Sequence, residues 1–217
     1  MKLQWQMVTP AQEARFSDFR DRKSLIEKDV NRCDRSLDFY AGENNTNLKS
    51  LHNILMTYIM YNFDLGYVQG MSDLLAPILF IITNSQWAYC KFLLDQNRSS
   101  GSKRQLLQLH ELLSVMDPKF AEYLKNLEPG YLFCFRWLLV IFKREFSYDD
   151  TMTIWEAFWT GIPGPNFHLF VGLAILDTEK SAIMDSLGIA QVSSLATPAG
   201  VIGGSVNYAR VSFFLTE

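Results

Sequence analysis

Apolar residues recur at intervals of three or four positions through most of this 217-residue chain. One stripe runs from Leu48 through Leu51 and Leu55 to Ile59. This spacing places side chains on one face of an α-helix, and such a face packs against other helices in a core. Regular alternation with a period of two, which is typical of strands, is absent from residues 1–187. The pattern therefore predicts an all-α fold with many helices.

Proline and short polar side chains mark the starts of several predicted helices. The segment Thr9–Gln12 has the form of a capping box with proline at the first helical position, and it predicts a helix through Arg22. Asp117 and Pro118 mark a second start. Residues 131–146 are apolar nearly all round and predict one buried central helix. Two further helices are expected over 152–159, capped by Asp149 or Asp150, and over 167–176.

Two stretches lack a helical pattern. Residues 95–103 are polar and predict a surface loop. Residues 188–217 are rich in Gly, Ser, Ala and Val, and Arg210 and Glu217 are their only charged residues. Within them, 206–215 has the composition of a strand, and a lone strand on a helical domain has no pairing partner. We therefore expect an irregular tail over 188–217, either disordered or non-native in origin.

Composition narrows the class of protein. The chain has 20 basic and 23 acidic residues, and the net charge of −3 offers no broad surface for nucleic acid. Its three cysteines are widely spaced and match no zinc pattern, so we expect no metal site and a reducing, cytoplasmic location. No apolar run reaches the roughly 20 residues that span a bilayer. A nucleotide-binding P-loop or GxGxxG motif is also absent, which argues against an independent nucleotide or redox enzyme.

The first chemical motif is Asp29 followed three positions later by Arg32. On a helix these side chains are neighbours, so the carboxylate can hold the guanidinium by charge-assisted hydrogen bonds. Holding the guanidinium lowers the entropic cost of presenting it to a phosphate. Taken alone, the pair could equally be a solvated salt bridge worth about 0–1 kcal/mol.

The second motif is Tyr67-Val68-Gln69-Gly70, in a predicted interhelical turn with Gly66 and Gly70 on either side. The Gln69 amide can accept a hydrogen bond from water through its oxygen and donate a hydrogen bond to a phosphate oxygen through its nitrogen. Tyr67 is better suited to packing and hydrogen-bonded support than to reaction. Taken alone, Gln69 could equally be a capping residue in the turn.

Together the two motifs supply a guanidinium and a neutral amide without a nucleotide-binding loop. Phosphoryl transfer from GTP needs both groups at the γ-phosphate, where the guanidinium neutralises charge and the amide orients the attacking water. An arginine supplied in trans to a GTPase is worth about 10³–10⁵ in rate. The combination therefore points to a regulator of a partner's hydrolysis.

The two motifs resemble the IxxDxxR and YxQG motifs of TBC domains, which are GTPase-activating modules for Rab-type small GTPases. The likeness to the Gyp-type branch of this family extends over about residues 3–185. The segments that carry it are 5–6, 20–35, 36–40, 54–81, 133–137 and 142–146.

The resemblance implies a V-shaped, multi-helix, all-α domain over residues 1–187. It assigns Arg32 as an arginine finger and Gln69 as a glutamine finger, with Asp29 positioning Arg32. Tyr67 and Gly70 would shape the interhelical turn that carries Gln69, which we call the glutamine loop. The implied partner is a GTP-bound Rab-family small GTPase, which binds the GTP and Mg²⁺, so the chain needs no cofactor of its own. The resemblance also implies a role in vesicle-mediated transport, with peripheral recruitment to endomembranes through the partner.

Several departures from the family pattern set limits on this interpretation. The opening RxxxW helix is absent, and residues beyond about 185 do not match the final helices, so the domain is expected to be truncated at both ends. Cys33 stands where this branch usually has threonine, and the chain is shorter than usual between Trp87 and Gln105. Two alternatives therefore stay open: a catalytically impaired Rab-binding scaffold, and a fragment that does not fold stably.

Overall fold

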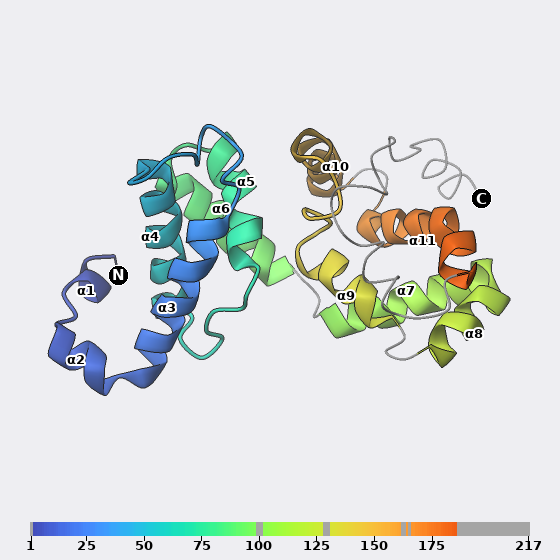
Figure 1. The fold of residues 1–217 in the computed structure, drawn as a ribbon, viewed down its shortest axis with the longest axis horizontal. Coiled ribbons are helices and arrows are strands. Elements are labelled where there is room, and N and C mark those ends of the chain that lie inside the picture. The colour runs from blue at the N-terminus through green and yellow to red at the C-terminus, as the bar shows by residue number, and fades with distance from the viewer. Residues whose placement is uncertain (1, 99–101, 128–130, 162–163, 165, 186–217) are drawn as a thin grey trace. The chain divides into compact units, whose positions relative to one another are not determined.

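The computed structural model describes residues 2–98, 102–127, 131–161, 164 and 166–185. The chain divides into two compact units, Met1–Ser99 (unit 1) and Ser100–Glu217 (unit 2), and each is described by itself. The described residues form eleven α-helices and no strand, which confirms the predicted all-α fold (Figure 1). No helix among them is both long and apolar enough to cross a membrane. The predicted tail over 188–217 lies outside the described residues.

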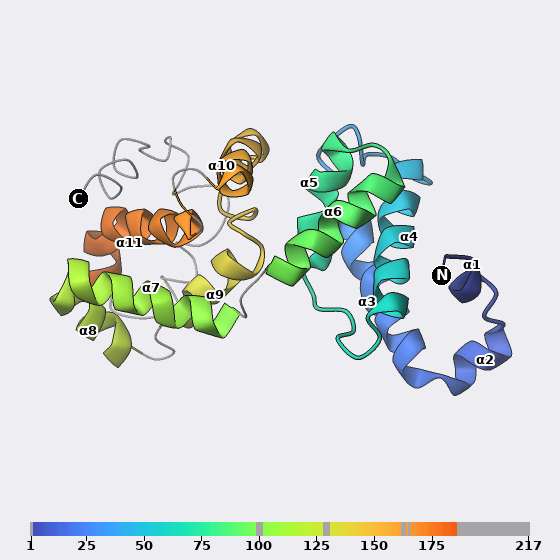
Figure 2. The same cartoon turned by 180° about the vertical axis from the view of Figure 1, so that it is seen from behind.

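Unit 1 is built around its fourth helix. Helix α4 packs against α1, α3, α5 and α6 (Figure 1 and Figure 2). Asn45 caps its N-terminus, because the Asn45 Oδ1 accepts hydrogen bonds from the backbone N–H groups of Asn47 and Leu48. The predicted stripe from Leu48 to Ile59 is buried. The helices of this unit are α1 (Lys2–Gln6), α2 (Pro10–Arg15), α3 (Ser17–Arg32), α4 (Thr46–Tyr61), α5 (Met71–Ile81) and α6 (Ser85–Arg98).

The predicted capping box is present, but the helix it starts is shorter than expected. Thr9 and Gln12 exchange the two capping hydrogen bonds, at 3.3 and 2.9 Å. Helix α2 then ends at Arg15, because Phe16 leaves helical geometry with φ −110° and ψ 81°. The Phe16 ring stacks on Phe63, with ring centroids 5.3 Å apart. A contact across 47 positions of chain thus accompanies the break, and no local signal reports it.

Unit 2 forms a second core. Helix α7 packs against α8, α9 and α11. Asp117 caps α8 as predicted, since its Oδ1 accepts a hydrogen bond from the Phe120 N–H at 3.1 Å. Buried side chains from α7, α8, α9 and α11 form the core, among them Leu109, Leu113, Phe120, Leu124, Trp137, Leu169 and Leu176. The helices of this unit are α7 (Ser102–Met116), α8 (Pro118–Asn126), α9 (Leu132–Leu139), α10 (Tyr148–Thr160) and α11 (Phe167–Asp185).

The prediction of one helix over 131–146 is wrong. Helix α9 ends at Leu139, and Ile141 and Phe142 take positive φ values of 48° and 59°. The turn is held by tertiary bonds: Trp155 Nε1 donates to the Ile141 carbonyl at 2.7 Å, and Arg136 pairs with buried Glu145. These partners stabilise a backbone geometry that apolar composition does not indicate.

Three other boundaries differ from expectation. Ser147, and not Asp149 or Asp150, caps α10, because its Oγ accepts the Asp150 N–H at 3.2 Å. Helix α11 extends nine residues past the predicted end at 176, to Asp185. The expected loop over 95–103 is helical where the structure describes it, since α6 continues to Arg98 and α7 begins at Ser102, and residues 99–101 lie outside the described residues.

Candidate functional site

The Asp29 carboxylate joins the two chemical motifs. It lies in the last turn of α3 with only 6% of its side chain exposed. Arg32 Nη2 donates to Asp29 Oδ1 at 2.5 Å, and Tyr67 Oη donates to Asp29 Oδ2 at 2.7 Å. Each carboxylate oxygen therefore serves a different segment of the chain. One buried group holds both the predicted guanidinium and the loop that carries Gln69.

These two bonds also explain why a carboxylate is tolerated in this buried position. A buried charge is costly unless it is paired and hydrogen-bonded, and Asp29 is both. Burial raises the pKa of Tyr67 well above its ordinary value, and the hydrogen bond to Asp29 raises it further. The phenol therefore remains a hydrogen-bond donor throughout the physiological pH range.

One nitrogen of the Arg32 guanidinium is held in place, while most of the side chain is exposed to solvent. Helix α3 ends at this residue, since Cys33 is already extended with φ −77° and ψ 122°. The Arg32 side chain is 57% exposed although one nitrogen is held by Asp29. A guanidinium has five N–H donors in a rigid fork, so several stay available to an incoming anion.

The loop with Tyr67 and Gln69 is fastened to α3 at a second point, Arg22. Arg22 Nη1 donates to the Phe63 carbonyl at 2.6 Å, and its guanidinium lies 4.2 Å from the centre of the Phe63 ring. A Cβ at Gly66 would lie 3.1 Å from the Arg22 Cζ, so this glycine permits the close approach. Arg22 belongs to neither of the two motifs that the sequence indicated. Its position seven residues before Asp29, on the same helix face, was the available signal.

Gln69 itself is exposed, and its side chain makes no hydrogen bond within the described part of the chain. Gly70 takes the N-cap position of α5 with φ 102°, a conformation that favours glycine. The alternative interpretation of Gln69 as a capping residue is therefore not what the structure shows. The Cys33 Sγ lies 3.6 Å from the Ser72 carbonyl oxygen. This contact sets the end of α3, with Arg32, against the start of α5, which follows Gln69.

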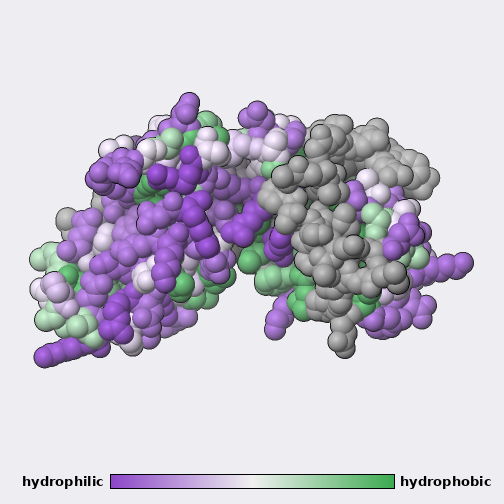
Figure 3. All heavy atoms as spheres, viewed as in Figure 1, coloured by the Kyte–Doolittle hydropathy of each residue, from purple (hydrophilic) through white to green (hydrophobic). Residues whose placement is uncertain are grey.

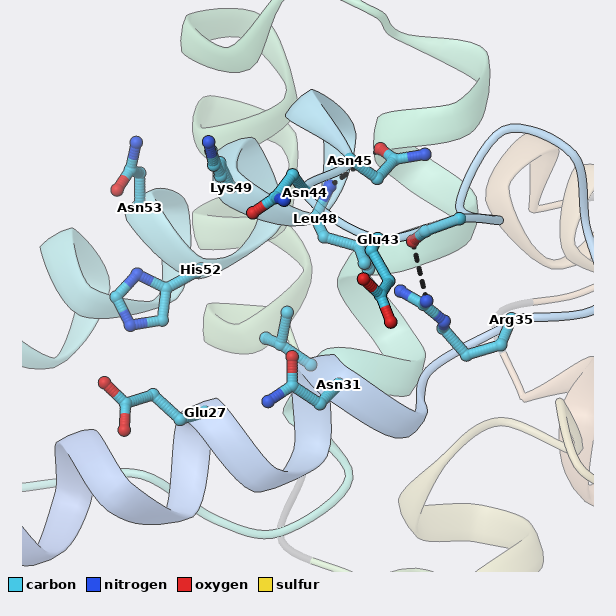
Figure 4. Close-up of a pocket in the computed structure, with 12 residues that line it drawn as sticks. Glu27, Asn31, Arg35, Glu43, Asn44, Asn45, Leu48, Lys49, His52 and Asn53 are labelled. Carbon is cyan, nitrogen blue, oxygen red and sulfur yellow. Dashed lines mark hydrogen bonds between the residues drawn. The ribbon is translucent and has the colours of Figure 1, made fainter.

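A polar groove lies on the other side of α3, between α3 and α4. Its volume is about 610 Å³, and Figure 4 shows Glu27 and Asn31 on α3 facing His52 on α4. Burial lowers the pKa of His52, and the negative charge of Glu27 opposes this shift. No motif in the sequence indicated this groove. The lining residues are Glu27, Val30, Asn31, Arg35, Gly42, Glu43, Asn44, Asn45, Leu48, Lys49, His52 and Asn53.

The surface around the Asp29 site and around the groove is polar. Figure 3 shows that the visible face of unit 1 is mainly hydrophilic. Within the described ranges, no group of three or more His, Cys, Asp or Glu side chains is arranged to hold a metal ion. The exposed polar groups of the site itself are the Arg32 guanidinium and the Gln69 amide.

Comparison with known proteins defines the class. The sequence model of the Rab-GTPase-TBC domain family matches residues 1–184. Human TBC1 domain family member 17 is 52% identical over 193 residues, covering 85% of this chain and 30% of that protein. Saccharomyces cerevisiae GTPase-activating protein GYP7 is 39% identical over 218 residues, covering 78% of this chain and 29% of that protein.

The fold agrees with the sequence match. The Ypt/Rab-GAP domain of Gyp1p has a TM-score of 0.73 with this chain at 19% identity, covering 93% of this chain and 73% of that one. The chain therefore belongs to the Rab-GTPase-TBC domain family, which confirms the resemblance seen in the motifs. It spans about 30% of the length of the full-length relatives described above.

Proposed function

We propose that this chain is a GTPase-activating domain that accelerates GTP hydrolysis by a Rab-family small GTPase. The observation that carries the proposal is the Asp29 carboxylate, which holds Arg32 with one oxygen and Tyr67 with the other. Membership of the Rab-GTPase-TBC domain family supports the same partner class.

In the proposed mechanism the chain supplies two groups to a nucleotide site on the partner. Arg32 donates N–H groups to oxygens of the transferring γ-phosphate and neutralises the charge that develops there. The side-chain oxygen of Gln69 accepts a hydrogen bond from the attacking water, and the side-chain N–H donates a hydrogen bond to a phosphate oxygen. GTP and Mg²⁺ belong to the partner.

Asp29, Tyr67 and Gly70 act in this proposal as positioning residues. A displacement of about 1 Å in a catalytic group can cost about 10²-fold in rate. Fixing Arg32 through a carboxylate that is itself bonded to the glutamine loop couples the positions of the two groups. The Arg32 side chain and the glutamine loop are therefore partly ordered before the partner binds, which lowers the entropic cost of positioning them for the reaction.

Single-turnover GTP hydrolysis by a panel of purified Rab-family GTPases tests the proposal. The parent chain is expected to stimulate at least one GTPase, and Arg32→Ala to lower that stimulation by about 10³-fold or more. Arg20→Ala is the matched control, because Arg20 is an exposed arginine on the same helix, outside the Asp29 cluster. Equal stimulation by the parent and Arg32→Ala would refute the assignment of Arg32.

The scaffold alternative gives a different result in the same experiment. A folded parent chain that binds a GTP-loaded GTPase but leaves its hydrolysis unchanged would be a Rab-binding scaffold. Cooperative thermal unfolding of the parent chain establishes that it is folded, and therefore separates this result from failure to fold.

A further inference from the structure

The groove and the glutamine loop flank the same exposed strip of α3. Successive residues of an α-helix are rotated by about 100°, so Arg32 lies about 60° from Asp29 on one side and about 100° from Asn31 on the other. Asp29 faces the Tyr67 loop and Asn31 lines the groove. Lys28 and Arg32 are both exposed between these two boundaries.

A protein seated over Arg32 must extend well beyond that one side chain. A standard protein–protein interface buries about 800 Å² on each partner, equivalent to a disc with a radius of about 16 Å. Asn31 is the neighbour of Arg32 in sequence, about 3.8 Å away between Cα atoms. A footprint centred on Arg32 therefore reaches the groove as well as the glutamine loop.

The chemistry of the groove suits a polypeptide segment. Val30 and Leu48 are buried apolar residues among those that line it, and amides and charges of both signs lie around them. The side chains of Asn31, Glu43 and Lys49 make no hydrogen bond or ion pair with other described residues, so they are available to a partner. Acidic and basic groups are balanced, which does not favour a phosphate or another polyanion.

We infer that the groove between α3 and α4 receives a polypeptide segment of the GTPase whose nucleotide faces Arg32. The segment has an apolar side chain for Val30 and Leu48, with polar or charged groups on either side for Asn31, Glu43 and Lys49. The inference rests on the proposed function. It assigns partner selection to the groove and rate acceleration to Arg32 and Gln69.

Charge reversal at the edge of the groove tests this division. Glu43→Lys and Lys49→Glu change exposed residues. Glu122→Lys and Lys125→Glu make the same changes at exposed positions on α8 in unit 2 and serve as matched controls. Asn31→Ala is a milder third variant that suits a helix. Circular dichroism and thermal unfolding identify any variant that fails to fold.

The readout is stimulated GTP hydrolysis as a function of activator concentration. The groove variants are expected to raise the half-saturating concentration about tenfold for a GTPase that the parent activates, with the maximal rate within about twofold. The α8 controls should match the parent. Half-saturating concentrations that stay at the parent's value in all three folded groove variants overturn the inference and leave the proposed function intact.

A parent chain that stimulates no GTPase refutes the proposed function instead. The same variants are then titrated against GTPases loaded with a non-hydrolysable GTP analogue. Weaker binding by the groove variants than by the α8 controls supports the groove as the partner site. Unchanged binding, or no binding by the parent, overturns that assignment too.

Discussion

At the scale of single residues, the Asp29 carboxylate has two neighbours that come from different segments of the chain. Its bond to Arg32 lies within one helix, whereas its bond to Tyr67 spans 38 positions. Removing one partner leaves a buried acceptor unsatisfied, which costs about 1–3 kcal/mol. The cluster therefore contributes to stability as well as to the geometry of Arg32, and the two contributions can be separated by substitution.

We predict that Tyr67→Phe lowers the free energy of unfolding by about 1–3 kcal/mol, because Asp29 Oδ2 loses its donor. Asp29→Asn should cost less stability, since an amide oxygen can still accept from Tyr67, but it weakens the hold on Arg32. Its expected effect is a loss of about 10²-fold in stimulated hydrolysis. Denaturant unfolding and single-turnover hydrolysis measure the two effects.

The double variant provides the control for this prediction. Residues that share one hydrogen-bond network have coupling energies of about 0.5–3 kcal/mol in a double-mutant cycle. Because Asp29→Asn keeps an acceptor for Tyr67, the cycle pairs Tyr67→Phe with Asp29→Ala, which removes that acceptor. Additive unfolding energies for Asp29→Ala and Tyr67→Phe would show that the bond between the two side chains contributes nothing measurable.

At the scale of elements, the glutamine loop is short and fixed at both ends. Arg22 and Asp29 on α3 hold its first part, and α5 begins directly after Gly70. Gly70 has φ 102°, which side chains with a Cβ adopt only with strain. The orientation of Gln69 thus depends on a glycine that carries no functional group.

We predict that Gly70→Ala lowers both stability and stimulated hydrolysis. The strain should cost about 1–3 kcal/mol of unfolding free energy, or displace Gln69 to relieve it. Gly161→Ala is the matched control, because Gly161 also has a positive φ, 70°, and no atom of the described residues lies within 4 Å of the position a Cβ would take there. Gly161 is the C-cap of α10 in unit 2, whereas both motifs belong to unit 1.

The two alanine variants should therefore differ in activity and not only in stability. Gly161→Ala is expected to keep the maximal stimulated rate of the parent at a temperature where both chains are folded. If Gly70→Ala also keeps that rate, the conformation at Gly70 does not set the position of Gln69.

At the scale of the whole molecule, each unit contains one half-buried histidine with a depressed pKa. Burial lowers the pKa of His52 in unit 1 and of His168 in unit 2. In the unfolded chain a histidine titrates near 6.5. Below that pH the unfolded state binds more protons than the folded state, so acidification favours unfolding.

We predict that the stability associated with keeping these two histidines neutral is fully present above about pH 6.5. This part of the free energy of unfolding is lost progressively as the pH falls through the folded-state pKa values of the two histidines. Thermal unfolding of the chain between pH 7.5 and pH 5 measures the effect. His52→Gln and His168→Gln should each reduce the dependence of the midpoint on pH. An unchanged pH dependence in both variants would assign the acid sensitivity to other groups.

Much of the geometry of the candidate site could be predicted from sequence because it is local. Asp29 and Arg32 are neighbours on any α-helix, since residues three apart share a face. The Thr9 and Asp117 caps are likewise local, and the stripe from Leu48 to Ile59 already specifies a buried face. These features, together with the two motifs, predicted the all-α fold and the family.

Tertiary structure decided the features that join distant parts of the chain. The bond from Tyr67 to Asp29, the stack of Phe16 on Phe63 and the turn at Ile141 all depend on partners at least 14 positions away. The groove between α3 and α4 arises in the same way, from two helices that meet in space. Periodicity and caps act over one or two helical turns, whereas these contacts form only when whole helices pack. For that reason the sequence alone predicted which residues would carry the chemistry, and packing determined how those residues are held together.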